Sequence, residues 1–300
     1  MNNMNAKIVV TGAGGGLGGE IVAQLLRVAP HALFAVSTRS PEAVSNLREK
    51  GVQVRHGDFD FPETLDEAFR GADRLLIIST RGGNEVRVRQ HRNALEAARR
   101  VGVDHVYYTS IVQREGSTFL PAGGHIESER DLKLSGLPYT ILRNGNYIEN
   151  LPMFLGFGLH GNVLALPPDG PTAWVARSDL AEGIARVMIH GDHADQTLLL
   201  TGPEALDFGD IAGLLRAESG ETLERRFISG DEFVAQLEEH GVATEIARVF
   251  ESGFRSRAAG ELAQVDPTLR QILDRPLRTV AEVLPRLLKT AALAKQSVDA

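Results

Sequence analysis

The chain has 300 residues, which is enough for two domains of ordinary size or for one large α/β domain with an appendage. It contains no cysteine, so a disulfide framework, a thiol nucleophile and a cysteine-ligated metal site are excluded. The formal net charge of −7 argues against a general nucleic-acid-binding protein, because neutralising phosphates requires clustered positive charge.

The first half of the chain alternates short apolar runs with segments of helical periodicity. The runs predict buried strands at residues 7–10, 33–36, 52–55, 75–78, 105–108 and 139–142. The segments between them predict helices from residue 17 towards residue 30 and at residues 41–50, 62–70, 84–101 and 124–135. Strands that alternate with helices imply βαβ units, and continuously apolar strands suit a sheet covered on both faces. We therefore expect an α/β protein with a Rossmann-type, doubly wound parallel sheet over residues 1–150.

The pattern changes after about residue 144. Residues 145–172 are rich in Gly, Pro and Asn, which predicts a loop excursion with small strands. Further helices are predicted at residues 178–190, 207–218, 231–239, 242–256 and 279–288, with strands at 197–200 and 223–228. We expect residues 151–300 to form a smaller, mostly helical substrate-binding region, with residues 172–202 packing back on the first domain.

No apolar run approaches the ~20 residues that a membrane helix needs. The short polar N-terminus also lacks the apolar core of a signal peptide. We therefore expect a cytoplasmic protein with no membrane or direct nucleic-acid partner, acting on a small molecule. A homodimer is compatible with the sequence, which does not define an oligomeric state.

A glycine-rich turn follows the first predicted strand and opens the first predicted helix. Gly12, Gly15 and Gly18 fit the spacing G-x-x-G-x-x-G, and the triplet at residues 14–16 leaves the register open. Glycines permit the tight turn and the approach of a pyrophosphate, which the free N–H groups of the helix N-terminus then bind. The residues that we expect to bind a dinucleotide here are Gly12, Ala13, Gly14, Gly15, Gly16, Leu17 and Gly18.

The end of the second strand predicts which dinucleotide is bound. An NAD site usually has Asp or Glu about 20 residues past the glycine motif, but no carboxylate occurs between Glu20 and Glu42. Arg39 stands there instead and is able to pair with a 2′-phosphate, while Thr38 and Ser40 donate hydrogen bonds. We therefore expect NADP(H) to be preferred over NAD(H). The alternative is that Arg39 is a solvated arginine in a polar loop.

In a parallel sheet the ligand lies outside the carboxyl ends of the strands. This rule selects Asp58 and Phe59, which are expected to flank the adenine, although Asp58 is equally compatible with a turn-forming role. It also selects Ser79, Thr80 and Ser110, which are expected nearer the nicotinamide.

Taken together, these motifs resemble the NmrA-like branch of the atypical short-chain dehydrogenase/reductases. The resemblance covers nearly the whole chain. It rests on V-T-G-A-x-G-x-L-G at residues 10–18, G-x-x-x-R-x-G-D at 51–58, Tyr-Thr-Ile-Leu-Arg-Asn-Gly at 139–145, Arg-Ser-Asp-Leu-Ala at 177–181 and Leu-Thr-Gly-Pro-Glu-Ala at 200–205. Within this branch the chain resembles NADPH:quinone oxidoreductases and triphenylmethane reductases, and the branch also includes non-catalytic NADP(H)-sensing regulators.

The resemblance raises the question of an acid–base group, because a standard short-chain dehydrogenase uses Tyr-x-x-x-Lys. This chain cannot form that pair, since its five lysines follow Asn3, Asn46, Glu129, Pro285 and Ala291 at the required spacing.

Isoflavone-reductase-like relatives instead use a lysine on the helix before the sixth strand, and that position falls on His125. The resemblance therefore implies that His125 donates a proton or binds the nicotinamide or substrate, oriented by Glu129 one helical turn later. The alternative is a histidine at a helix start that is hydrogen-bonded to a nearby loop. A metal site is not expected, because His125 and Glu129 have no third ligand at a matching spacing.

The segment after the sixth strand is the expected lining of the substrate pocket. Asn144, Asn146, Tyr147 and Phe154 are the candidates, although aromatic residues there are also typical of a core. The resulting hypothesis is an NADPH-dependent reductase that transfers a hydride directly to a quinone or similar conjugated carbonyl compound. The alternatives are an NADP(H)-sensing regulator without turnover, and a biosynthetic lyase or isomerase on the same scaffold.

Overall fold

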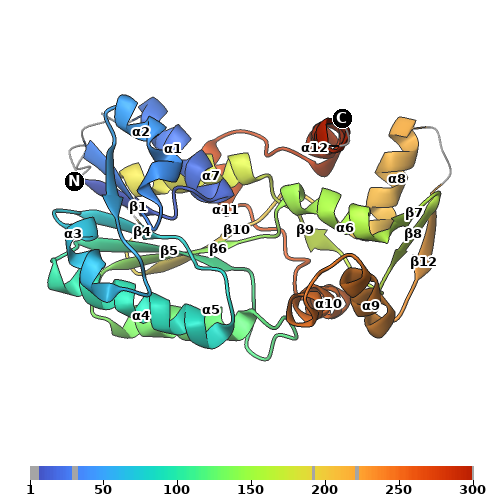
Figure 1. Ribbon diagram of the computed structural model, residues 1–300, viewed down its shortest axis with the longest axis horizontal. Coiled ribbons are helices and arrows are strands. Elements are labelled where there is room, and N and C mark those ends of the chain that lie inside the picture. The colour runs from blue at the N-terminus through green and yellow to red at the C-terminus, as the bar shows by residue number, and fades with distance from the viewer. Residues whose placement is uncertain (1–6, 29–32, 191–192, 220–222, 299–300) are drawn as a thin grey trace.

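The computed structural model describes residues 7–28, 33–190, 193–219 and 223–298. In these ranges, seven parallel strands form one sheet in the order β10-β6-β5-β4-β1-β2-β3 (Figure 1). The strands are β1 (Ile8–Thr11), β2 (Phe34–Thr38), β3 (Gln53–His56), β4 (Arg74–Ile77), β5 (His105–Ile111), β6 (Tyr139–Asn144) and β10 (Gln196–Leu200). The chain runs outward from β1 through β2 to β3 and then crosses back to β4, so the direction of winding switches beside β1. This order confirms the predicted Rossmann-type parallel sheet.

Helices cover both faces of this sheet, as expected for a fully parallel one. The alternation of side chains along β1 shows the two layers: Ile8 and Val10 pack in one hydrophobic cluster and Val9 packs in the other. On the first face lie α1 (Gly16–Val28), α7 (Arg177–His190) and α11 (Thr268–Leu273). On the second face lie α3 (Leu65–Phe69), α4 (Asn84–Arg100) and α5 (Ala122–Leu134).

A second group of elements, which we call the small lobe, has a hydrophobic core of its own. Its helices are η4 (Ile148–Asn150), α6 (Leu151–Gly158), α8 (Phe208–Ser219), α9 (Gly230–Glu239), α10 (Thr244–Ala258) and α12 (Val280–Val298). Its strands are β7 (Leu159–His160), β8 (Val163–Leu166), β9 (Thr172–Ala173), β11 (Ala205–Leu206) and β12 (Glu224–Phe227). None of the helices in the described ranges is long and apolar enough to cross a membrane.

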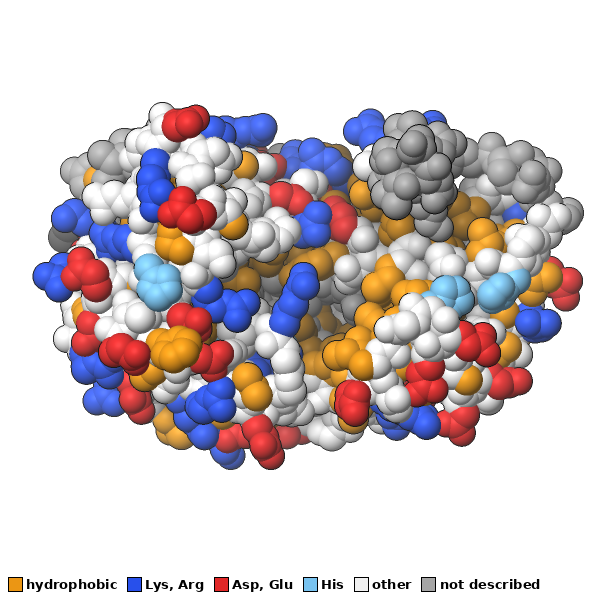
Figure 2. Space-filling model, viewed as in Figure 1, with side chains coloured by type: hydrophobic (Ala, Val, Ile, Leu, Met, Phe, Trp, Pro, Cys, Tyr) orange, Lys and Arg blue, Asp and Glu red, His pale blue; other side chains and the backbone are white. Residues whose placement is uncertain are grey.

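The small lobe lies beside the carboxyl ends of the sheet strands, to the right of the sheet in Figure 1. Figure 2 shows that the face drawn is hollowed between the two parts of the molecule and that hydrophobic side chains line the hollow. The architecture therefore places a recess where the rule for parallel sheets expects a ligand.

Several predicted elements differ from the structure for identifiable reasons. Residues 145–172 were expected to be a loop excursion, but they contain α6. Pro152 is tolerated there because it stands in the first helical turn, and burial of Leu151, Phe154 and Leu155 outweighs the weak helix propensity of the glycines. The predicted helices at 41–50 and 62–70 are instead short pieces, η2 (Pro41–Val44) with α2 (Asn46–Glu49), and η3 (Pro62–Thr64) with α3.

The helix α7 is tied to the segment before α12 by one buried carboxylate. Asp179 is fully buried and accepts hydrogen bonds from Arg275 Nη2 at 2.8 Å and from the backbone N–H of Arg278 at 2.7 Å. The side chain of Arg278 also donates to this carboxylate. Because α7 packs on the large sheet and α12 packs in the small lobe, this ion cluster connects the two parts.

We expect Asp179→Ala to lower the free energy of unfolding by about 2–3 kcal/mol, because it removes a buried carboxylate that satisfies two arginines. Asp231→Ala is the matched control, since it breaks a pair with Arg248 in which the Asp231 side chain is 84% exposed. That control should change stability by less than about 0.5 kcal/mol. Urea unfolding followed by circular dichroism measures both, and equal effects would contradict this role of Asp179.

Candidate active site at the carboxyl edge of the sheet

The turn between β1 and α1 requires glycine at two positions. Gly12 has a φ of +65°, which side chains rarely adopt, and its carbonyl accepts from the Gly15 N–H at 3.0 Å. A Cβ at Gly18 would lie 2.2 Å from the Gly12 carbonyl oxygen, so the helix packs against the turn without room for a methyl group. Gly14, Gly15 and Gly16 are exposed. The result is an open stretch of backbone at the N-terminus of α1, which is suited to an anion.

An arginine that was not predicted to belong to the site lies over this turn. A Cβ at Gly16 would be 2.6 Å from Arg177 Nη1, so the guanidinium covers the start of α1. Arg177 Nε donates to Glu20 at 2.6 Å, which holds the side chain in place. Its only sequence signal was its position in the Arg-Ser-Asp-Leu-Ala motif at 177–181, to which no role had been assigned. The guanidinium places N–H donors over the start of α1, while Glu20 balances its charge.

The residues expected to select the cofactor lie at the end of β2 and just beyond it. Arg39 and Ser40 are exposed, and the Ser40 N–H donates to Thr38 Oγ1 at 3.2 Å. The nearby carboxylate of Asp60 accepts from Arg89 at 2.6 Å and from Gln90 at 2.8 Å, and these hydrogen bonds lower the pKa of Asp60. Because Arg89 neutralises Asp60, an anion near Arg39 faces little repulsion from it.

The expectation for Phe59 needs correction, and Asp58 has the turn-forming role that the sequence also allows. Asp58 Oδ1 accepts from the Asp60 N–H at 2.9 Å, which forms an Asx turn and uses one of the two carboxylate oxygens. The ring of Phe59 is only 8% exposed and packs in the core between the sheet and α3 and α4. It therefore has little free surface with which to flank an adenine.

The polar residues after β4 and within β5 form hydrogen bonds with side chains of β5, α4 and α5. The Ser79 N–H donates to Thr109 Oγ1 at 2.9 Å, and the Thr80 N–H donates to His91 Nε2 at 3.2 Å. The buried hydroxyl oxygen of Thr80 has no hydrogen-bond partner among the described residues. Ser110 differs, because its hydroxyl donates to Glu129 at 2.6 Å and the residue is buried within β5.

His125 is buried in the first turns of α5, and its hydrogen-bond partner differs from the one expected. Its Nδ1 lies 2.9 Å from the hydroxyl of Tyr108, a residue of β5. Glu129, expected to orient His125, instead accepts from Ser110, from Gln113 and, through both of its oxygens, from Arg143. The expected pairing is therefore wrong, because the Arg143 guanidinium of β6 binds this carboxylate more strongly than a neutral imidazole does.

The structure fixes the tautomer of the neighbouring His91. Because Nε2 of His91 accepts from the Thr80 N–H, the proton must be on Nδ1, which lies 2.9 Å from Ser128 Oγ. The Ser128 hydroxyl in turn donates to the Gly124 carbonyl at 2.7 Å. A chain of neutral hydrogen bonds thus runs from the end of β4 to the start of α5.

Burial sets the protonation states in this cluster. Burial, with a smaller contribution from Arg87, lowers the pKa of His91 to about 3 and that of His125 well below its ordinary value. Burial also raises the pKa of the Tyr108 hydroxyl. Both histidines and the tyrosine are therefore uncharged at neutral pH.

The residues predicted to line a substrate pocket divide into two groups. Asn144 ends β6 and is buried, and its Oδ1 has no hydrogen-bond partner among the described residues. Its Nδ2 donates to the hydroxyl of the half-buried Tyr147 at 3.4 Å, and Asn146 lies between them in the chain. Phe154 instead belongs to the aromatic core of the small lobe and contacts Phe208 and Phe254.

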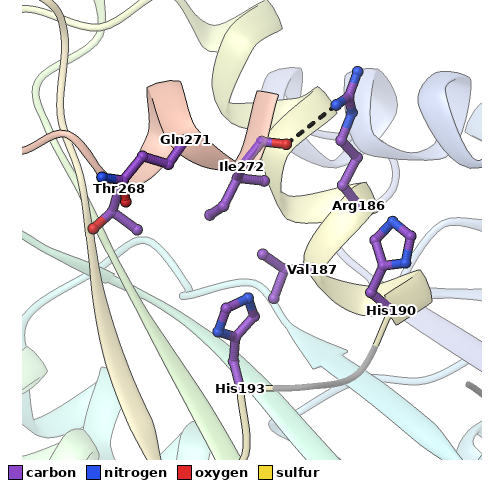
Figure 3. A pocket seen from close by; sticks show the side chains of 7 residues that line it. All are labelled: Arg186, Val187, His190, His193, Thr268, Gln271 and Ile272. Atoms are coloured by element: carbon purple, nitrogen blue, oxygen red, sulfur yellow. Dashed lines mark hydrogen bonds between the residues drawn. The ribbon is translucent and has the colours of Figure 1, made fainter. Parts of the chain in front are cut away.

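A separate cavity of about 330 Å³ lies between α7 and α11, away from these residues. Figure 3 shows His190, His193 and Arg186 at its rim, with Arg186 Nη1 donating to the Ile272 carbonyl at 3.1 Å. Its lining contains none of the predicted site residues. Within the described residues, no group of three His, Cys, Asp or Glu side chains is arranged to hold a metal ion.

Comparisons with known proteins identify the family to which this chain is similar. The model of the NmrA-like family matches residues 4–280. An NmrA-like family domain-containing oxidoreductase of Aspergillus flavus is 36% identical and covers 90% of this chain and 91% of its own. The structure of an NADPH-dependent quinone oxidoreductase of Escherichia coli complexed with NADPH has 31% identity and a TM-score of 0.88, and covers 93% and 99% of the two chains. Triphenylmethane reductase of Citrobacter sp. complexed with NADP(H) has 29% identity and a TM-score of 0.85, and covers 95% and 99%.

The depressed pKa of His91 predicts an acid-sensitive contribution to stability. The unfolded chain binds a proton near pH 6.5 and the folded chain only near pH 3, so the contribution is complete above 6.5 and is lost as the pH falls towards 3. Between pH 7 and pH 5, we expect the wild type to lose about 2 kcal/mol more unfolding free energy than His91→Gln does.

Urea titrations at both pH values measure this difference. The control is His56→Gln, which replaces an exposed histidine and should retain the acid loss of the wild type. The same acid loss in His91→Gln as in the wild type would contradict a neutral, buried His91.

Proposed function

The chain belongs to the NmrA-like family and is an oxidoreductase, and we propose that it reduces a quinone or a similar conjugated carbonyl compound with NADPH. The observation that carries the proposal is the open glycine turn with Arg39 where an NAD site has a carboxylate. The E. coli and Citrobacter relatives, whose structures hold NADPH and NADP(H), support the same cofactor.

The residues at the carboxyl edge of the sheet fit NADPH. The exposed backbone of residues 14–16 and the N-terminus of α1 receive the pyrophosphate, and Arg177 adds N–H donors over the same turn. Arg39 pairs with the 2′-phosphate, while Thr38 and Ser40 line the same end of β2. The residues after β4, Ser79 and Thr80, face the region expected for the nicotinamide.

The proposed hydride transfer takes place beside side chains that are uncharged, His125 and Tyr108. Bound NADPH supplies a hydride, and the acceptor takes up this hydride and one proton to give the hydroquinone. Because His125 is neutral, it acts as a hydrogen-bond donor to the acceptor oxygen rather than as an imidazolium acid. This role requires Tyr108, whose hydroxyl lies 2.9 Å from Nδ1, to donate to that nitrogen, so that the proton of His125 is on Nε2. The hydroquinone anion is stabilised by resonance and takes its proton from water.

This chemistry explains why the protein functions without Tyr-x-x-x-Lys. An ordinary ketone gives a strongly basic alkoxide and needs a positioned acid. A quinone gives a weakly basic phenolate, for which a single hydrogen-bond donor suffices. A quinone therefore suits a site in which burial keeps His91 and His125 uncharged.

The direct test is oxidation of NADPH by the purified protein with a panel of quinones, triphenylmethane dyes and enones, followed through the absorbance of the reduced cofactor. We expect turnover with quinones and none with simple ketones. Tight NADPH binding without turnover on any acceptor would contradict the proposal and would favour an NADP(H)-sensing regulator.

We expect Arg39→Ala to weaken NADPH binding about 30-fold while changing NADH binding less than about twofold, because only NADPH carries the 2′-phosphate. Fluorescence titration of both cofactors measures this. Arg48→Ala, which removes a partly exposed arginine of α2, should leave both dissociation constants unchanged. An equal loss for the two cofactors in Arg39→Ala would refute the 2′-phosphate contact.

We expect His125→Ala to lower kcat with 2-methyl-1,4-naphthoquinone about 100-fold, the typical effect of removing one hydrogen-bond donor to a developing oxyanion. His125→Gln, which retains a donor, should recover part of the loss. Both variants should bind NADPH as the wild type does, which stopped-flow kinetics and titration establish together. An unchanged kcat in His125→Ala would remove this residue from the chemistry.

A further inference from the structure

The small lobe buries an arginine inside a cage of aromatic rings. Arg257, near the end of α10, is 3% exposed. Its Cζ lies 5.1 Å from the ring centre of Phe154, 5.2 Å from that of Trp174 and 5.4 Å from that of Phe254. These cation–π contacts cover the faces of the guanidinium and leave its N–H groups at the edges to be satisfied by other partners.

Two of these nitrogens, Nε and Nη1 of Arg257, have no hydrogen-bond partner among the described residues. The neighbouring carboxylate of Asp169 is already used, since it accepts from Arg225 at 3.1 Å and from the Phe208 N–H at 2.8 Å. Burial lowers the pKa of Arg257 to about 10, so the side chain is still a cation at neutral pH.

Arg225, a second arginine of the small lobe, has the hydrogen bonds that are typical of a structural arginine. Arg225 Nη1 donates to the carbonyls of Leu164 and Leu166, and Nη2 donates to Pro167 and Asp169. Arg257 lacks such oxygen partners at Nε and Nη1, so its aromatic contacts and the charge of Asp169 offset its desolvation only in part. Arg257 is therefore retained at a cost in stability, which is typical of a group that serves a ligand.

The position of Arg257 connects it with the site at the carboxyl edge. A Cβ at Gly253 would lie 3.1 Å from Arg257 Nη1 and 3.7 Å from the ring of Phe119. Phe119 belongs to the segment that leaves β5, and Phe154 belongs to α6, which follows β6. The guanidinium thus lies among chain segments that leave the same sheet edge as Ser110 and Asn144.

We propose that Arg257 determines acceptor specificity by binding an anionic substituent, a carboxylate or sulfonate, on an aromatic quinone. This inference rests on the proposed quinone reductase activity and names its substrate class. The anion would satisfy the free N–H groups with charge-assisted hydrogen bonds, and the apolar hollow would hold the ring system. A neutral quinone would leave the buried cation without a partner and would be the poorer acceptor.

The test compares two acceptors that differ in one group, 1,4-naphthoquinone-2-sulfonate and 2-methyl-1,4-naphthoquinone. The readout is the ratio of their kcat/KM values with NADPH, measured in the wild type and in Arg257→Met. We expect this ratio to fall about 100-fold in the variant, which corresponds to the loss of a charge-assisted contact. Arg255→Met, two residues earlier on α10 and half exposed, is the matched control and should keep the wild-type ratio. An unchanged ratio in Arg257→Met would overturn the proposal.

Thermal unfolding separates a binding role from a structural one. Because Arg257→Met removes an uncompensated buried charge and keeps an apolar chain of similar length, we expect the variant to have a higher Tm than the wild type. A lower Tm together with an equal loss of activity on both acceptors would show that Arg257 is a structural residue held by its aromatic contacts.

Binding of the anionic quinone is also measured under conditions in which no hydride is transferred. Calorimetric titration of 1,4-naphthoquinone-2-sulfonate into the protein with NADP⁺ present measures binding without hydride transfer. Binding by the wild type and about 100-fold weaker binding by Arg257→Met supports the site even if neither quinone is reduced, in which case the proposed function alone fails. Equal binding by the two proteins overturns the proposal of an anion site.

Discussion

Every strand of the large sheet runs in the same direction. This constraint determines at which edge of the sheet the site residues lie. Parallel pairing brings the carboxyl ends of β1, β2, β4, β5 and β6 to one edge. The glycine turn, Arg39, Thr80, Ser110 and Asn144 meet there although up to 132 residues separate them in the chain. The small lobe lies beside the same edge, and hydrophobic side chains line the hollow between the two parts.

Burial, more than charge, shapes the chemistry of this edge. Glu129 and Arg143 neutralise each other, while His91, His125 and Tyr108 are held uncharged by their surroundings. A site of this kind is a weak source of protons and a good environment for hydride transfer, because little water or fixed charge competes with the acceptor. Arg257 in the small lobe differs, since it is a cation whose Nε and Nη1 have no hydrogen-bond partner among the described residues.

Local sequence patterns predicted the fold well because strands such as β1 and β4 are largely apolar runs and because glycine or proline occurs in many of the turns. They predicted the glycine turn for the same reason, since its conformation is dictated by residues adjacent in sequence. They missed α6, where tertiary burial outweighs local propensity, and they misjudged the partners of His125 and Glu129. Those partners, Tyr108 and Arg143, come from neighbouring strands, and Arg177 reaches the glycine turn from more than 150 residues away. Such contacts are set by the packing of strands and helices and leave no local signal.

The most direct test of the account is a crystal structure of the protein with NADPH. The account predicts the pyrophosphate over the backbone of residues 14–16, the 2′-phosphate within hydrogen-bond distance of Arg39 and the nicotinamide beside Thr80 at the ends of β4 and β5. A 2′-phosphate that points away from Arg39, or a nicotinamide bound outside this edge, would contradict it.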